Sequence, residues 1–199
     1  MSNLTRICAA AVAFVLPASA GAKPESYEFD KTHTTIRASW NHWGYSRQAI
    51  EFTNYSGTLK LDFDKPAKST VEVEFNLANG YWVGAPESDR FENHLASPDL
   101  FDIAQFPTAR FTATAFESED GKTGVMRGKL TIKEQTHDVA LNVRLNNRGA
   151  MGGKARAGFS ATGTIDRSQW GLGFGSPAVS NEIDISIETE LVGPAVRAQ

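Results

Sequence analysis

Apolar and polar residues alternate along most of the chain. Beyond Lys23, the clearest alternating runs are residues 59–63, 71–77, 139–145 and 183–187. A period of two places successive side chains on opposite faces of a β-strand, so each run predicts a strand with one buried and one solvated face. Because one face of each strand is wet, we expect antiparallel rather than parallel sheet.

Weaker alternation and a high content of β-branched and aromatic residues predict further strands. They lie at residues 27–41, 48–53, 110–116, 124–133 and 154–165. Turn-forming residues separate the strands at 64–66, 119–121 and 146–149. If residues 54–57 only bend one long strand, the chain holds about eight strands.

One segment, around residues 89–103, has helical signals instead. Asp89 and Glu92 have the spacing of a capping box, and Ser97-Pro98 resembles an N-cap followed by a first-turn proline. Phe91, His94 and Leu95 then share one helical face. We predict a short helix pair that closes or shapes one end of the sheet structure.

Small residues on the predicted inner faces distinguish between two architectures. About eight antiparallel strands joined by hairpins form either a closed barrel or a two-sheet sandwich. Small residues occupy inward positions at Ala113, Ala115, Gly128, Ala155, Ala157, Ala161 and Gly163. A filled sandwich would favour larger aliphatic residues there, so we predict a barrel whose interior has room for one ligand. The alternative is that small residues meet large ones across a packed core.

The first residues have the layout of a secretory signal peptide. Arg6 precedes an uncharged apolar run at residues 7–16, and small residues follow up to Ala20. Such a run is too short to span a hydrocarbon layer of ~30 Å. We expect cleavage after Ala20 or Ala22, which leaves a soluble exported protein without an integral membrane segment. Cys8, the only cysteine, is lost with this leader, so no disulfide is expected.

The length and charge of the chain favour one domain that does not bind nucleic acid. We expect residues 1–20 to be the leader, 23–192 a single folded domain and 193–199 a C-terminal tail. The formal net charge of −3 provides no basic surface for a phosphate backbone. Exposed strand edges and aromatic barrel ends would permit a homodimer.

No sequence motif indicates catalysis, a metal or a cofactor. His33, His42, His94 and His137 form no His-x-His or His-x-x-x-His pair, and the mature chain offers no cysteine partner for zinc. A nucleophile elbow, a P-loop and a dinucleotide-binding glycine motif are also absent from the sequence. Alternation predicts that His42 and His137 point inward and that His33 points outward.

Aromatic residues near the strand ends and the helical segment are the main candidates for ligand contact. They are Trp40, Trp43, Phe52, Phe91, Phe101, Phe106, Phe111, Trp170 and Phe174. Neighbouring inward positions complete the predicted site with Ile36, Ala38, His42, His94, Leu95 and Phe159. Any one aromatic is equally consistent with plain core packing. In an apolar pocket a few polar groups set ligand orientation, and His42 is suited to that role.

A series of motifs, in order along the chain, resembles the YceI-like family of periplasmic polyisoprenoid-binding proteins. The first are Asp30-x-x-His33, His42-Trp43-Gly44-Tyr45-Ser46, His94-Leu95-x-Ser97-x-Asp99-Leu100-Phe101-Asp102 and Phe106-Pro107-x-Ala109-x-Phe111. The later ones are Gly128-x-Leu130-Thr131-Ile132, Gly153-Lys154-Ala155-Arg156-Ala157-Gly158-Phe159 and Gly171-Leu172-Gly173. The chain departs from the usual family pattern at residues 134–139 and at Phe91-Glu92.

The resemblance implies an all-β fold, an extended eight-stranded antiparallel barrel similar to lipocalins, with a hydrophobic pore. It also implies a periplasmic location and no cofactor-dependent catalysis. The implied cargo is a long apolar lipid: a polyisoprenoid such as a polyprenyl phosphate, an isoprenoid quinone or a fatty amide.

Three functions therefore stay open from the sequence. The first is transport or storage of such a lipid in the barrel lumen. The second is an enzyme acting on an apolar substrate, with His42 or His94 as general base. The third is a β-sheet interaction module with a filled interior and a membrane or protein partner.

Overall fold

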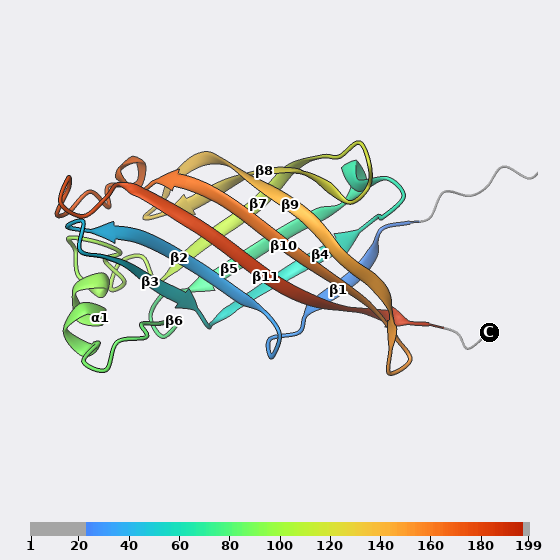
Figure 1. The fold of residues 1–199 in the computed structure, drawn as a ribbon, viewed down its shortest axis with the longest axis horizontal. Helices are drawn as coiled ribbons and strands as arrows, with labels where there is room; N and C mark the ends of the chain where they lie inside the picture. Colours follow the sequence, from blue (N-terminus) through green and yellow to red (C-terminus); the bar gives the residue numbers. More distant parts are fainter. Residues whose placement is uncertain (1–22, 197–199) are drawn as a thin grey trace, which may run out of the picture.

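The strands roll into an elongated antiparallel barrel with one short helix at one end (Figure 1). This computed structural model describes residues 23–196. The predicted leader, residues 1–20 or 1–22, lies outside the described residues. The predicted C-terminal tail begins too early at residue 193, because the last strand continues to Ala195.

Residues 23–196 form eleven strands, one α-helix and two short 3₁₀ helices. In chain order they are β1 (Glu25–Phe29), β2 (Thr35–His42), β3 (Ser46–Phe52), β4 (Tyr55–Leu61), η1 (Pro66–Lys68), β5 (Thr70–Asn76), β6 (Tyr81–Trp82), α1 (Asp89–Ala96), β7 (Thr108–Glu117), β8 (Thr123–Ile132), β9 (Gln135–Met151), β10 (Lys154–Asp166), η2 (Arg167–Trp170) and β11 (Glu182–Ala195).

The sheet closes on itself, which confirms the predicted eight-stranded antiparallel barrel. Strand order is β1-β4-β5-β7-β8-β9-β10-β11, and β1 pairs back onto β11 to complete the ring. Strands β2, β3 and β6 extend the wall from β11 towards α1. The pairs β1/β2, β3/β4 and β5/β6 are successive parts of three interrupted strands. The predicted bend near residues 54–57 is the short break between β3 and β4.

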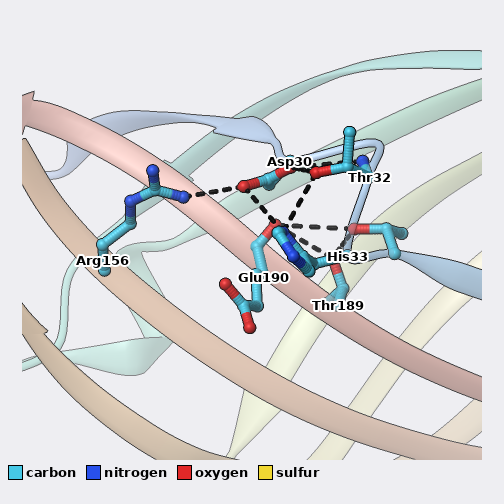
Figure 2. Close-up of polar contacts among 7 residues, drawn as sticks. Asp30, Thr32, His33, Arg156, Thr189 and Glu190 are labelled. Atoms are coloured by element: carbon cyan, nitrogen blue, oxygen red, sulfur yellow. Dashed lines mark hydrogen bonds and ion pairs between the residues drawn. The ribbon is translucent and has the colours of Figure 1, made fainter. Parts of the chain in front are cut away.

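The predicted strand 27–41 is broken in the structure, because the Asp30 side chain forms a turn. Its carboxylate accepts hydrogen bonds from the Thr32 backbone N–H (3.2 Å) and hydroxyl (2.6 Å), and the Arg156 guanidinium donates to it at 2.8 Å. Strand β11 passes this break without interruption. The Asp30 N–H donates to the Glu190 carbonyl, and the Glu190 N–H donates to the His33 carbonyl (Figure 2).

The predicted turn at residues 146–149 is wrong. Strand β9 runs through these residues and pairs with β10 on both sides of them. Phe159 lies opposite Leu145 and Gly158 opposite Asn147, so Asn146 is the extra residue of a β-bulge. The chain reverses later, at residues 152–153, where two consecutive glycines have positive φ.

The predicted helix pair is a single helix, α1. Its N-cap is Ser88 and not Asp89, because the Ser88 carbonyl already accepts the first helical bond, from the Glu92 N–H. The predicted capping box is therefore absent at this helix start. Ser97 caps the C-terminus instead, and its hydroxyl donates to the His94 carbonyl at 2.7 Å. The chain then continues in turns, with Asp102 in the left-handed region.

Glycines on the inner face do not enlarge the lumen, contrary to the prediction from small residues. A Cβ atom built on Gly128 would lie 2.4 Å from the Phe111 ring, and one on Gly163 would lie 2.7 Å from Leu141. Both positions are therefore filled from neighbouring strands, which is the packed-core alternative. Two of the predicted alanines behave differently: Ala157 is core, whereas Ala161 lines an internal cavity.

The turn at Asp30 generates a pH-dependent stability prediction. Hydrogen bonds from Thr32, Arg156 and His33 hold the pKa of the Asp30 carboxyl well below its usual range. The ionised Asp30 carboxylate therefore stabilises the fold fully at a pH above its unfolded-state pKa of about 3.9. This stabilisation is lost as the pH falls from that value through the lower pKa of the folded state. Asp30→Asn should lower the free energy of unfolding at neutral pH, and the deficit should shrink in acid.

Denaturant unfolding over a range of pH would measure this difference. Asp64→Asn is the matched control, because Asp64 is an exposed aspartate in the turn that follows β4. A deficit for Asp30→Asn that stays constant into acid would contradict the proposed role of the ionised carboxylate.

Candidate functional site

An apolar cavity of about 520 Å³ occupies the barrel interior. This is within the range of ~300–1,000 Å³ that is usual for ligand pockets. The inward residues of every long strand line it; on β11 these include Ile183, Ile185 and Ile187. Apart from tryptophans, its polar side chains are limited to His42, His94, Arg167 and Thr189.

The cavity reaches the surface at the end of the barrel that carries α1, which we call the α1 end. Trp43 and Phe174 both line the cavity there, yet they are 61% and 53% exposed. Trp43 lies in the β2–β3 turn, and its N–H donates to the Ala178 carbonyl at 2.7 Å. This bond joins the β2–β3 turn to residues 171–181, the loop between η2 and β11.

Helix α1 covers part of this opening. Its predicted inward face is correct: Leu95 is buried, and Phe91 and His94 also line the cavity. The Phe91 ring lies against Trp40, with ring centroids 5.8 Å apart. The His94 and Phe174 rings are perpendicular with centroids 4.7 Å apart, so the helix and the loop 171–181 are in contact across the opening.

Arg167 organises that loop from inside. Its side chain is 7% exposed, and its guanidinium donates to the backbone carbonyls of Leu172, Phe174, Val179 and Ser180. Burial lowers the pKa of this guanidinium from its ordinary value. Carbonyl dipoles rather than a carboxylate surround the charge, so one side chain fixes the loop that carries Phe174.

At the opposite end the β4–β5, β7–β8 and β9–β10 connections meet, and we call this the hairpin end. A smaller pocket of about 100 Å³ lies between the first two connections. It shares Leu61, Phe116, Met126, Val143 and Phe159 with the main cavity. The two spaces are therefore separated only by side chains.

One group of side chains on the outer wall has the composition of a metal site. Asp30, His33 and Glu190 each place one potential ligand atom within 4.8 Å of the others. The Asp30 carboxylate, however, is already bound by the Arg156 guanidinium and by Thr32 (Figure 2). These contacts account for the cluster as the structural turn between β1 and β2.

The part of the chain that matches a known protein family is the part that forms the barrel. The YceI-like domain matches residues 27–191, from β1 to β11. The chain belongs to the YceI-like family. The resemblance found in the sequence motifs is therefore confirmed.

Relatives and solved structures agree with this assignment. A UPF0312 protein of Pseudomonas putida (strain W619) is 34% identical over 176 residues, covering 85% of this chain and 89% of that protein. BcnA of Burkholderia cenocepacia is similar in structure, with a TM-score of 0.72 at 23% identity over 81% of this chain and 98% of BcnA. A polyisoprenoid binding domain from Saccharophagus degradans, implicated in plant cell wall breakdown, has a TM-score of 0.61 at 13% identity over 85% and 99%. At these identities the two structures establish the fold.

Within this YceI-like barrel, the predicted site residues lie on the cavity wall with two exceptions. Phe106 lies in the turn before β7 and does not line the cavity. Trp170 is 1% exposed and also lies outside the cavity lining. Its indole N–H donates to the Leu130 carbonyl at 3.1 Å, and the His137 ring lies perpendicular to its own with centroids 5.0 Å apart. Trp170 is therefore a packing residue.

The histidines of this YceI-like chain follow the predicted strand faces, with one difference. His33 points outward and His137 is half-buried against Trp170. His42 lines the cavity but is exposed, because it lies at the end of β2 where the wall ends. It is a rim residue and not an interior one.

Two kinds of cavity residue were missed in the sequence. The first are aliphatic residues such as Leu59, Val73 and Leu141, which alternation places inward but which a search for aromatic clusters passes over. The second is Arg167, whose role depends on carbonyls that are brought together only in the folded loop. No local pattern indicates it.

No helix among residues 23–196 is long and apolar enough to cross a membrane.

Loss of the Arg167 guanidinium should destabilise the YceI-like barrel. Hydrogen bonds to charged groups contribute roughly 1.5–3 kcal/mol each, so Arg167→Met should lower the free energy of unfolding by at least about 3 kcal/mol. Urea denaturation would measure the change. Arg144→Met, at an exposed position on β9, should change it by less than about 0.5 kcal/mol. Equal effects of the two substitutions would show that Arg167 is not needed to hold the loop.

Proposed function

We propose that this protein binds one long apolar lipid in the barrel lumen and carries or stores it outside the cytoplasm. The observation that carries this proposal is the continuous apolar cavity, which reaches the surface beside Trp43 and Phe174. A module with a filled interior would lack such a space, so the cavity counts against the third hypothesis from the sequence.

The chemistry of the cavity wall favours a long chain over a compact ligand. Each buried methylene contributes about 0.8 kcal/mol, and association costs about 4–15 kcal/mol. Roughly 5–20 methylene equivalents are therefore needed before binding becomes favourable. With few polar side chains to add hydrogen bonds, the hydrocarbon of the ligand has to supply that contact, and an elongated barrel suits an extended hydrocarbon better than a compact one (Figure 1).

Two observations support an isoprenoid chain in particular. The barrel has the same fold as the Saccharophagus degradans domain named for polyisoprenoid binding. Its polar lining residues are also concentrated at the α1 end, where His42 and His94 lie beside the exposed aromatics. We propose that the hydrocarbon tail lies along the barrel and that the head group, whether quinone, phosphate or amide, lies at this opening.

We also propose that binding involves no chemical step. The His94 Nε2 atom lies 3.8 Å from the Asp99 carboxylate, and the His94 and Phe174 rings are perpendicular with centroids 4.7 Å apart. Both His42 and His94 lie on the cavity lining at the α1 end. We propose that they orient the head group of the lipid and do not act as general bases.

Filling the lumen should abolish lipid binding without unfolding the barrel. Ala161 is buried on the cavity wall, and Ala161→Phe would place a ring inside it. If the introduced ring displaces only two methylenes of the lipid from the cavity, Kd rises roughly tenfold, so we expect at least a tenfold loss of affinity. Thr162→Phe adds the same ring to the outer face of β10 and serves as the control.

Organic extraction and mass spectrometry of both purified variants would measure the bound lipid. The wild-type protein and Thr162→Phe should retain it, and Ala161→Phe should not. A wild-type protein with no extractable lipid and no affinity for isoprenoid quinones would overturn the proposed function.

Export generates a separate prediction, since a carrier outside the cytoplasm must lose its leader. The protein recovered from its native source should begin at residue 21 or 23, according to cleavage after Ala20 or Ala22. Intact-mass measurement distinguishes the two. Replacing Ala18 and Ala20 by bulky residues should block cleavage. A wild-type chain that is exported but keeps residues 1–20 would contradict the predicted cleavage.

A further inference from the structure

The small pocket at the hairpin end continues the line of the main cavity. It lies between the β4–β5 connection and the β7–β8 hairpin, and five of its lining residues also line the main cavity. Strand β9 shows the continuity most simply. Val139 and Leu141 line the main cavity, Val143 lines both spaces, and Leu145 lines only the small pocket.

Three large side chains form the partition between the two spaces. Phe116, Met126 and Phe159 line both, from β7, β8 and β10. None of the three is fully buried. A methionine has three rotatable bonds and a flexible thioether, so Met126 is the side chain of this partition that adjusts most readily to a hydrocarbon chain.

The far wall of the small pocket is more firmly held. Phe63 stacks on Phe159 with an interplanar angle of 13°, and the Arg148 guanidinium lies 4.2 Å from the Phe63 ring centroid. The lining of the same pocket also includes polar residues, among them Asp62, Ser69 and Glu117. The apolar path therefore ends within this pocket at the hairpin end.

We infer that the small pocket is a tail subsite, which takes the far end of an apolar chain too long for the main cavity. This inference rests on the proposed function. It identifies the residues that set the preferred chain length: Phe116 and Met126 as the partition, Phe159 as its side that is held by stacking on Phe63, and Leu145 as part of the terminal pocket.

Binding of a series of polyprenols to lipid-stripped protein would test the subsite. Farnesol, geranylgeraniol and solanesol share one head group and differ only in chain length. Leu145→Trp fills the small pocket from a position that does not line the main cavity. Displacing as few as two methylenes costs roughly tenfold in Kd, so we expect at least that loss for solanesol and none for farnesol.

Two further variants keep the test independent of folding defects. Asn142→Trp adds the same side chain to the outer face of β9 and should bind all three alcohols as the wild type does. Phe116→Ala removes part of the partition and should raise the affinity for solanesol relative to that for farnesol. Leu145→Trp and Phe116→Ala thus shift the length preference in opposite directions.

The outcomes separate this inference from the proposed function. If the wild-type protein binds the alcohols but neither variant alters the dependence on chain length, the tail subsite is overturned and lumen binding stands. A uniform loss for all three alcohols in Leu145→Trp, with no gain in Phe116→Ala, overturns the subsite equally. If the wild-type protein binds none of them, the proposed function fails first.

Discussion

The pairing of β1 with β11 is the contact on which the rest of the molecule depends. Glu28 lies opposite Val192 and Phe29 opposite Leu191, so the first strand is joined to the last. An open sheet with this alternation would expose one apolar face and two unpaired edges. Closure hides the face and removes both edges in one step. It also fixes the circumference, and side chains of moderate size do not fill the resulting lumen.

The two ends of the barrel are organised by different interactions. At the α1 end, charged donors bind backbone carbonyls: Arg167 holds the loop 171–181, and the Lys133 ammonium donates to the Leu100 carbonyl at 2.9 Å. Apolar surface at that end therefore remains available to the cavity. At the hairpin end, aromatic rings such as Phe63 and Phe159 pack on one another and narrow the lumen. The α1 end is therefore open to the surface, and the hairpin end closes the lumen.

Strands were predictable from the sequence because their signal is local. Alternation in the runs 71–77 and 183–187 reports directly which side chains face inward, and the structure agrees. The wrong predictions concern residues whose side chains favour more than one local structure. Asn146-Asn147 is turn-like in composition but forms a bulge, and Ser97 ends one helix where the pattern predicts the start of another. Those choices depend on partners far away in the sequence.

The site was predictable to the extent that it follows from strand faces. Residues such as Ile36, Ala38 and Trp40 were placed on the cavity by alternation alone. Trp170 was misassigned because aromatic character does not distinguish the inside of a cavity from the packing around it. Arg167 was missed because its carbonyl partners come from a loop whose path no local pattern describes.

The contact between Gly128 and Phe111 restricts how this sequence can change. A Cβ atom at residue 128 would lie 2.4 Å from the Phe111 ring and 2.7 Å from the Thr112 carbonyl oxygen, so a smaller residue at 111 alone would not admit alanine there. Residue 128, on strand β8 beside β7, is therefore expected to stay glycine during evolution whatever residue stands at 111. The width of the lumen at this level then depends on the size of residue 111 alone, and a drift in ligand preference would pass through that one position.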